Sequence, residues 1–295
     1  MLNPERIALL TDSTADLPPA MREGKAIYVV PLKIICEDGE YSDGEDIFAQ
    51  DIYRRLRGGE LPRTSLPEGG VVSDTFGRIR ADGYEKVIAV MLSSGLSGTY
   101  NMVRLQGEQR EDLEVAVFDS NSGSLGIGII LLQLWEEILA GAGWNELVER
   151  RTPYLIGNTY PFFSVDTLEY LYKGGRIGKV TAMAGSLLNI KPIITFAQDG
   201  QLQSIAKVRG RRQVQDKILD LLRRLVEERR RAGKSLRYNL GVANGGAPEE
   251  MAELSARMRA AFPDYGHCWE GALDATLSVY IGDGVLGGGI QFLED

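Results

Sequence analysis

The chain has 295 residues, of which 44% are hydrophobic and 25% charged, so it can bury the cores of two ordinary globular domains. Its formal net charge of -8 argues against a nucleic acid or an anionic membrane surface as the partner. No apolar run approaches the roughly 20 residues that a membrane-spanning helix needs, so we expect no stable membrane insertion and a soluble cytoplasmic protein.

The first half of the chain alternates short apolar runs with amphipathic stretches. The runs are IALLTDS, AIYVVPLKII, KVIAVML and LEVAVFDS, and we expect helices near 46–57, 71–82, 97–107 and 124–141. Such alternation predicts a mostly parallel sheet flanked by helices. The helix near 124–141 is apolar on most of its faces, which favours a central core helix but also fits the wall of an apolar cavity.

A different pattern begins near residue 156. The strand-like YPFFSV is followed by a hairpin signal at Asp199-Gly200 and by an amphipathic helix in RRQVQDKILDLLRRLVEERRRAGK. A strand at YNLGVAN, a helix near 248–261 and strands near 267–270, 275–281 and 288–293 complete the chain. We therefore predict an α/β N-terminal domain over residues 1–155 and an α+β C-terminal domain with a mixed or antiparallel sheet over residues 156–295.

Metal-ligating and catalytic side chains are scarce in this sequence. Cys36, Cys268 and His267 are its only cysteines and its only histidine, which excludes a disulfide framework and a Cys/His metal cluster. His267 lies in the polar stretch PDYGHCWEG, and we interpret it as a surface histidine rather than a member of a catalytic triad. We predict no metal site and no cofactor.

Two glycine patterns suggest phosphate sites at first sight. YIGDGVLGGG spaces Gly282, Gly284 and Gly287 as a dinucleotide-binding turn does, but the eight residues that follow cannot supply the helix that receives the pyrophosphate. KGGRIGKV resembles a P-loop but has Lys173 where glycine is required and Val180 where the magnesium-binding hydroxyl belongs. No Gly-x-Ser-x-Gly elbow occurs either, so we assign no catalytic residue.

Small hydroxyl side chains gather where several of the predicted strands end. In an open α/β sheet, ligands bind beyond the carboxyl ends of the strands. Each hydroxyl alone is better explained by a turn or a helix cap, but together they suggest a pocket of neutral donors for an anionic oxygen. The residues are Ser13, Thr14, Thr64, Ser65, Ser93, Ser94, Ser97 and Thr99.

Six segments of the chain resemble the successive signatures of the DegV family. They cover nearly the whole chain in the family's order, and the block around Gly174-Gly175-Arg176 is the most specific. The resemblance implies a two-domain fatty-acid-binding protein with the acyl chain in a tunnel between the domains. The segments are LLTDSTADLP (9–18), RTSLPEGG (63–70), LSSGLSGTYN (92–101), FDS (118–120), DTLEYLYKGGRIGKVTAMAGSLLNIKPIIT (166–195) and KVRGRR (207–212).

The resemblance also implies roles for particular residues. Thr64, together with Ser93 or Ser94, would hold the carboxylate of a long-chain fatty acid such as hexadecanoate. Arg176 would position the acidic head or dock a partner. In characterised relatives that partner is a separate ATP-dependent fatty acid kinase, which converts the bound acid to an acyl phosphate. The remaining head-group residues by the same resemblance are Ser65, Tyr280 and Gly282.

The sequence departs from the family pattern at two places. Leu66 and Glu68 replace a glutamine and a serine of the family's Thr-Ser-Gln-Pro-Ser loop, and a carboxylate pointing inward there would repel an anion. Tyr280-Ile281-Gly282-Asp283-Gly284 stands where the family has His-Thr-Gly-Pro-Gly. The phenol of Tyr280 can donate one hydrogen bond but has no positive charge. We therefore expect the protein to bind a fatty acid and expect any functional change to concern its coupling to the kinase.

Two other functions remain open from the sequence. An enzyme of acyl or phosphoryl transfer would need Asp12, Asp119 or Asp283 as a base or a metal ligand. A binder of another amphiphile, such as a retinoid, a sterol or a lysolipid, would use the same apolar tunnel with a different head group. Neutral donors favour a carrier over an enzyme.

Overall fold

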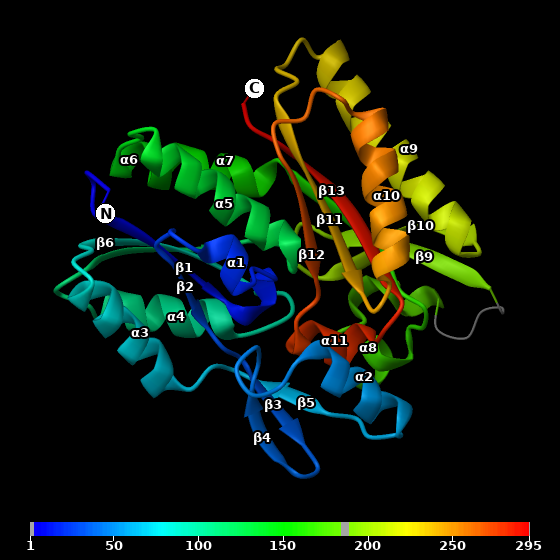
Figure 1. The fold of residues 1–295 in the computed structure, drawn as a ribbon, viewed down its shortest axis with the longest axis horizontal. Helices are drawn as coiled ribbons and strands as arrows, with labels where there is room; N and C mark the ends of the chain where they lie inside the picture. The colour runs from blue at the N-terminus through cyan, green and yellow to red at the C-terminus, as the bar shows by residue number, and fades with distance from the viewer. Residues whose placement is uncertain (1–2, 184–188, 295) are drawn as a thin grey trace.

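The computed structural model describes residues 3–183 and 189–294, and it contains three sheets that build two layered halves (Figure 1). The first half holds a four-stranded parallel sheet in the order β2-β1-β6-β7. Its strands are β1 (Ile7–Asp12), β2 (Ile27–Val30), β6 (Lys86–Met91) and β7 (Glu114–Asp119).

Helices cover both faces of the parallel sheet. α3 (Gly69–Ala81) and α4 (Thr99–Glu108) lie on one face, and α5 (Leu125–Leu139) lies on the other (Figure 1). Every residue of β1 is buried, which is the pattern of a central parallel strand between two helical layers. The predicted α/β half is therefore confirmed.

A small antiparallel sheet of three strands was not anticipated from the sequence. The apolar run AIYVVPLKII predicts one strand, but it is divided at Pro31-Leu32 into β2 and β3 (Lys33–Cys36), which belong to different sheets. Proline has no N–H to donate and so interrupts the ladder. β3 pairs with β4 (Gly39–Ser42) and β5 (Arg63–Ser65), and α2 (Ala49–Arg57) connects the last two.

The second half contains a six-stranded mixed sheet in the order β10-β9-β8-β13-β11-β12. β11 and β12 run parallel, and the other neighbours run antiparallel. The predicted hairpin at Asp199-Gly200 joins β9 to β10, and Gly200 takes the left-handed φ of 74° that the turn requires. The strands are β8 (Thr159–Ser164), β9 (Ile190–Phe196), β10 (Leu202–Arg209), β11 (Tyr238–Gly245), β12 (Cys268–Ala272) and β13 (Val285–Phe292).

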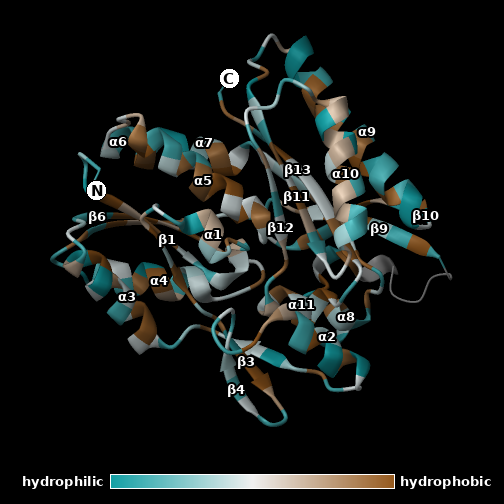
Figure 2. Cartoon of the chain, viewed as in Figure 1, coloured by the Kyte–Doolittle hydropathy of each residue, from teal (hydrophilic) through white to brown (hydrophobic). Residues whose placement is uncertain are grey.

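α5 is the element on which both halves pack. It contacts β1 and β6 of the parallel sheet as well as β8, β11, β12 and β13 of the mixed sheet. Figure 2 shows the helix hydrophobic along much of its length, whereas the outer helix α9 (Arg211–Arg231) is largely hydrophilic. A helix enclosed by two sheets has no polar face, which explains the continuous apolar pattern of this segment. α9 and α10 (Pro248–Ala261) cover the other face of the mixed sheet.

The strand predicted at 275–281 is wrong, because these residues form the helix α11 (Ala275–Ile281). The short ATLSVYI segment alternates in polarity, which satisfies a strand and one face of a short helix equally well. Asp274 decides between them, since its side chain accepts the N–H of Leu277 at 2.7 Å and caps the helix. α11 packs on α2 and on α8 (Glu169–Lys173).

The remaining elements are short connections. No helix within residues 3–183 and 189–294 combines the length and the apolar character needed to cross a bilayer. These connections are η1 (Ser13–Ala15), α1 (Pro19–Arg22), α6 (Trp144–Glu146), η2 (Leu147–Arg151), α7 (Thr152–Gly157) and η3 (Gly178–Met183).

Candidate functional site

A cavity of about 540 Å³ lies between the two halves of the molecule. This volume is in the range of small-molecule binding sites. Its wall is formed by α5, α11, β8, β11, β13 and the loops after β5 and β6, and most of the lining side chains are apolar. The apolar lining includes Leu32, Leu66, Leu92, Leu96, Leu125, Ile129, Phe162, Phe163, Leu171, Phe196, Leu202, Leu273, Leu277, Ile281 and Val285.

The cavity extends along β13. Val285, Gly287 and Gly289 of this strand all line it, and at about 3.4 Å per residue the first and last are roughly 14 Å apart. Pro161, which is paired with Gly289 across to β8, lines the end remote from the turn that follows α11. The cavity therefore extends over roughly 14 Å along the strand, a length that suits an extended apolar chain.

Gly241 lines the cavity and has no side chain that would occupy its space. Gly241 of β11 is paired with Gly289, and both residues line the cavity. A Cβ atom at Gly241 would lie 3.5 Å from Ile129 Cγ2 of α5, an ordinary van der Waals contact. One added carbon fits there, but a longer side chain would have to extend into the cavity.

Polar groups gather at the end of the cavity nearest the C-terminal end of α11. Thr64 Oγ1 and Tyr280 OH lie 2.5 Å apart, so β5 and α11 meet in a hydrogen bond between residues 216 positions apart. The Arg176 guanidinium lies over the Tyr280 ring, 5.0 Å from its centroid, and Arg176 Nη1 donates to Gly174 O at 2.7 Å. This end combines two hydroxyls and one cation, which are groups that bind a carboxylate.

The Gly-Gly-Arg motif holds Tyr280 in place. A Cβ atom at Gly174 would lie 2.4 Å from Tyr280 Cδ1, so the phenol ring occupies space that only glycine leaves free. The motif's Arg176 makes a cation–π contact with the same ring. Gly282 ends α11 with a φ of 66°, and a Cβ atom there would meet Tyr170 Cε2 at 2.7 Å.

Five of the seven predicted ligand and head-group residues line the cavity, and two do not. Thr64, Ser65, Ser94, Arg176 and Tyr280 belong to the lining. Ser93 is fully buried, and its hydroxyl donates to Gly200 O at 2.8 Å, which attaches the loop after β6 to the β9–β10 hairpin. Gly282 shapes the turn after Tyr280 and is not among the lining residues. Tyr280 reaches the cavity from the helix α11, not from the strand predicted at 275–281.

Each of the two places where the sequence departs from the family pattern has one carboxylate, and both carboxylates pair with cations. Glu68 Oε1 lies 2.7 Å from Lys33 Nζ, and its side chain is 61% exposed. Asp283 forms an ion pair with Arg57 of α2. Within the described residues neither carboxylate lines the cavity, whereas Leu66 contributes an apolar side chain to it. Glu68 and Asp283, which depart from the family pattern, therefore add no negative charge to the lining at the polar end of the cavity.

A cluster of three buried carboxyl groups supports the start of α11 and was not foreseen. Asp43 accepts the N–H groups of Ala275 and Thr276 at 3.0 and 3.2 Å, and Asp16 accepts the N–H of Asp274 at 2.7 Å. Burial raises the pKa of Asp16 to about 7, and burial followed by the charges of Asp43 and Asp16 raises the pKa of Asp274. The cluster joins residues more than 200 positions apart, so no local signal could reveal it.

Asp12 and Asp119, two of the candidate bases or metal ligands for an enzyme, instead accept hydrogen bonds from backbone N–H groups. Asp12 accepts the N–H groups of Thr14 and Leu92 at 3.0 and 2.8 Å, and burial raises its pKa. Asp119 Oδ1 accepts the N–H of Ser94 at 3.1 Å and shapes the loop after β6. Neither side chain belongs to the cavity lining in the part of the chain that the structure describes.

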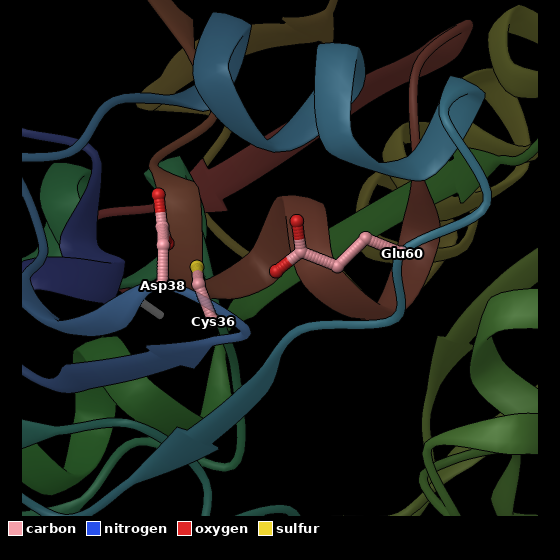
Figure 3. Close-up of side chains that lie close together, drawn as sticks. All are labelled: Cys36, Asp38 and Glu60. Atoms are coloured by element: carbon pink, nitrogen blue, oxygen red, sulfur yellow. The ribbon is translucent and has the colours of Figure 1, made fainter.

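Cys36, Asp38 and Glu60 form a group outside the cavity that could offer three metal ligands (Figure 3). Arg55 Nη2 lies 2.8 Å from Asp38 Oδ2, and its Nη1 lies 2.9 Å from Glu60 Oε2, so one guanidinium neutralises both carboxylates. Burial raises the pKa of the Cys36 thiol to about 11, which keeps it protonated at neutral pH. The group is explained by its ion pairs, and we assign no metal to it.

His267 lies outside the cavity lining, immediately before β12. Its Nε2 lies 2.9 Å from Glu136 Oε1, and its ring stacks on Trp269 with a centroid distance of 4.9 Å. The side chain is 49% exposed. The position agrees with the interpretation of a surface histidine.

Comparison with known proteins identifies similar chains over almost the full length. A family model described as "Uncharacterised protein, DegV family" matches residues 6–293. A DegV domain-containing protein of Clostridium acetobutylicum is 38% identical over 283 residues, which cover 96% of this chain and 98% of the relative.

Two solved structures share the fold. A fatty-acid-binding DegV family protein of Thermus thermophilus superposes with a TM-score of 0.89 at 30% identity, over 98% of this chain and 100% of that one. DegV of Bacillus subtilis, described as a fatty acid binding protein, superposes with a TM-score of 0.85 at 28% identity, over 99% and 100% of the two chains. The likeness extends to the whole arrangement of sheets and helices described above.

Proposed function

The chain belongs to the DegV family, and on that premise we propose that it binds a long-chain fatty acid with its tail in the apolar cavity and its carboxylate beside Thr64 and Tyr280. The observation that carries the proposal is the Thr64–Tyr280 hydrogen bond at one end of an otherwise mostly apolar, elongated cavity. The relatives described as fatty-acid-binding proteins support the same ligand class.

The acyl tail supplies the affinity in this proposal. Burying about 15 methylene groups at about 0.8 kcal/mol each contributes roughly 12 kcal/mol before the costs of association are subtracted. The long apolar wall between Val285 and Gly289 provides the surface for that burial. The affinity for the fatty acid then depends mainly on its acyl tail, and the carboxylate sets the orientation of the acid in the cavity.

The carboxylate is stabilised by neutral donors and one cation. Tyr280 OH and Thr64 Oγ1 share one hydrogen bond, so the pair retains one hydroxyl proton to donate to the ligand. The Arg176 guanidinium lies beside Tyr280, and Ser94 also belongs to the cavity lining. A buried carboxylate needs such compensation because its desolvation is otherwise unfavourable.

The protein acts as a carrier in this proposal and catalyses no reaction by itself. We place the ligand between an N-terminal domain over residues 1–155 and a C-terminal domain over residues 156–295. We further propose that a separate ATP-dependent fatty acid kinase takes the acid from the polar end. Arg176, Ser65 and Tyr280 at this end would present the head group to that partner.

Denaturing organic extraction of the purified protein tests the proposal directly. We expect mass spectrometry of the extract to show long-chain fatty acid at close to one equivalent per chain. An extract that contains a different amphiphile would assign the cavity to that ligand. An extract without any lipid, from protein that was never delipidated, would refute the carrier function.

Thr64→Val tests the position of the carboxylate. The substitution keeps the volume of the side chain and removes its hydroxyl, so we expect fatty acid affinity to fall about 5- to 30-fold, as the loss of one or two hydrogen bonds predicts. Competition with a fluorescent fatty acid measures this change. Thr75→Val in α3 makes the same replacement away from the cavity lining and should bind as the wild type does. Equal affinity of all three proteins would place the carboxylate elsewhere.

A further inference from the structure

The cavity ends, at the side remote from Tyr280, against buried polar side chains. On β13, Val285, Gly287 and Gly289 line the cavity, and the next residue on the same face of the strand is Gln291. Gln291 is fully buried. The two glycines leave space between the sheet and α5, and a long amide side chain then fills it.

The neighbouring elements change in the same way at the same level. Residues directly opposite each other in a sheet share a face, so the partners of Gln291 lie in the same layer. These partners are Asn239 of β11 and Thr159 of β8. On α5, Gln133 follows the cavity-lining Ile129 by one turn, and its Oε1 accepts from Asn239 Nδ2 at 2.9 Å. We call the four residues Gln133, Asn239, Gln291 and Thr159 the polar layer.

Hydrogen bonds connect the polar layer throughout. Asn239 Nδ2 also donates to Gln291 Oε1 at 3.3 Å, and Gln291 Nε2 donates to Thr159 Oγ1 at 3.2 Å. The Thr159 hydroxyl donates in turn to Leu155 O at 2.7 Å. Two further bonds join the layer to its surroundings, from Gln133 Nε2 to Glu137 Oε1 at 3.1 Å and from His267 N to Asn239 Oδ1 at 3.0 Å. Every side-chain nitrogen and oxygen of the layer thus has a protein partner.

A satisfied polar layer resists the entry of an acyl chain. A methylene group that enters an apolar space raises the affinity about fourfold. Entry into the polar layer would instead separate hydrogen bonds that the methylene group cannot replace. Each buried donor or acceptor left without a partner lowers the affinity about 5- to 150-fold, which exceeds the gain. The chain is therefore expected to stop where the layer begins.

Thr159 is the member of the polar layer that meets the cavity. It belongs to the cavity lining and is only partly buried, whereas Asn239 and Gln291 are fully buried. Its hydroxyl is engaged with Gln291 and Leu155, so the side chain presents carbon atoms to a ligand. A terminal methyl group can pack on these atoms without disturbing the hydrogen bonds behind them.

We propose that the polar layer sets the maximum length of the acyl chain and that Thr159 is the specificity-determining residue on which the terminal methyl group rests. The inference rests on the proposed function, because the carboxylate beside Thr64 and Tyr280 fixes the other end of the ligand. An acid longer than the space between these two ends must bend or leave its head-group site.

A homologous series of straight-chain saturated fatty acids, lengthened one carbon at a time, tests this inference on delipidated protein. Competition with a fluorescent fatty acid gives the affinity of each member. We expect the affinity of the wild type to rise about fourfold per added carbon up to an optimal length and to fall beyond it. An affinity that rises through to the longest acid would overturn the inference.

Thr159→Ala and Thr159→Ile move the floor of the cavity in opposite directions. Alanine removes the outer atoms of the side chain, so the optimal acid should become about one or two carbons longer. Isoleucine adds one carbon and keeps the β-branched shape that suits a strand, so the optimal acid should become about one or two carbons shorter. Thr75→Ala in α3 makes the same truncation away from the cavity lining and should keep the wild-type optimum.

Thermal unfolding identifies the variants that fold, and either Thr159 variant is informative without the other. An optimal length that is unchanged in a folded Thr159 variant, or that moves against the expected direction, would overturn the inference. Failure of every acid in the series to bind the wild type would instead refute the carrier function.

Discussion

Gly241→Leu is expected to lower the affinity for a long-chain fatty acid about 100-fold, whereas Gly241→Ala should leave it nearly unchanged. A Cβ atom at this position makes only ordinary contacts, at 3.5 Å from Ile129 Cγ2 and 3.6 Å from Leu125 Cδ2. The further carbons of leucine must extend into the cavity and displace about four methylene groups of the tail. At about 0.8 kcal/mol each, their loss amounts to roughly 3 kcal/mol.

Titration of delipidated protein with a fluorescent fatty acid measures this effect, and thermal unfolding without ligand supplies the control. The leucine side chain fills empty apolar space, so the unliganded variant should unfold near the wild-type temperature. Weak binding by a folded Gly241→Leu protein then reports on the cavity alone. Wild-type affinity in that variant would show that the acyl tail follows another path.

Asp43→Ala should lower the free energy of unfolding by about 3 kcal/mol. Asp43 is 3% exposed, and its two carboxylate oxygens accept the first two backbone N–H groups of α11, from Ala275 and Thr276. Hydrogen bonds to a charged group contribute about 1.5–3 kcal/mol each, and alanine leaves both buried donors without an acceptor. Relief of the repulsion among Asp43, Asp16 and Asp274 offsets part of the loss.

Urea denaturation of Asp43→Ala and of Glu45→Ala tests this expectation. Glu45 is exposed in the same loop, and its replacement should change the unfolding free energy by less than about 0.5 kcal/mol. Because α11 carries Tyr280, the Asp43 variant should also bind fatty acid more weakly. A loss below about 1 kcal/mol in Asp43→Ala would mean that Asp274 alone suffices to support the helix.

Segments that resemble DegV signatures predict four of the polar residues at the proposed head-group site. Thr64, Ser94, Arg176 and Tyr280 were identified from segments that resemble DegV signatures, and all four line the cavity. Ser93 shows the limit of a motif, because its hydroxyl is used within the protein to bond Gly200 of a distant hairpin. A motif identifies a loop, but the direction of each side chain in it depends on what packs against the loop.

By itself the sequence determined the elements whose signals are local and repeated. The apolar run of β1 and the 3.6-residue period of α9 each span enough residues to exclude the alternative, which is a helix for β1 and a strand for α9. Seven residues of α11 were too few, since their alternation fits a strand as well as one helix face. The helix forms because Asp43, 232 positions away, accepts its first N–H group and Asp274 caps it.

Only the tertiary structure decided how the cavity and its polar end are built. The apolar pattern of α5 allowed a core helix or a cavity wall, and the helix serves as both because two sheets enclose it. The Asp16 contact with the backbone of Asp274 joins positions 258 residues apart, and the burial that raises the pKa values of both residues exists only after folding. Local propensities act over a few residues, whereas a cavity and the charges around it result from packing among segments far apart in the chain.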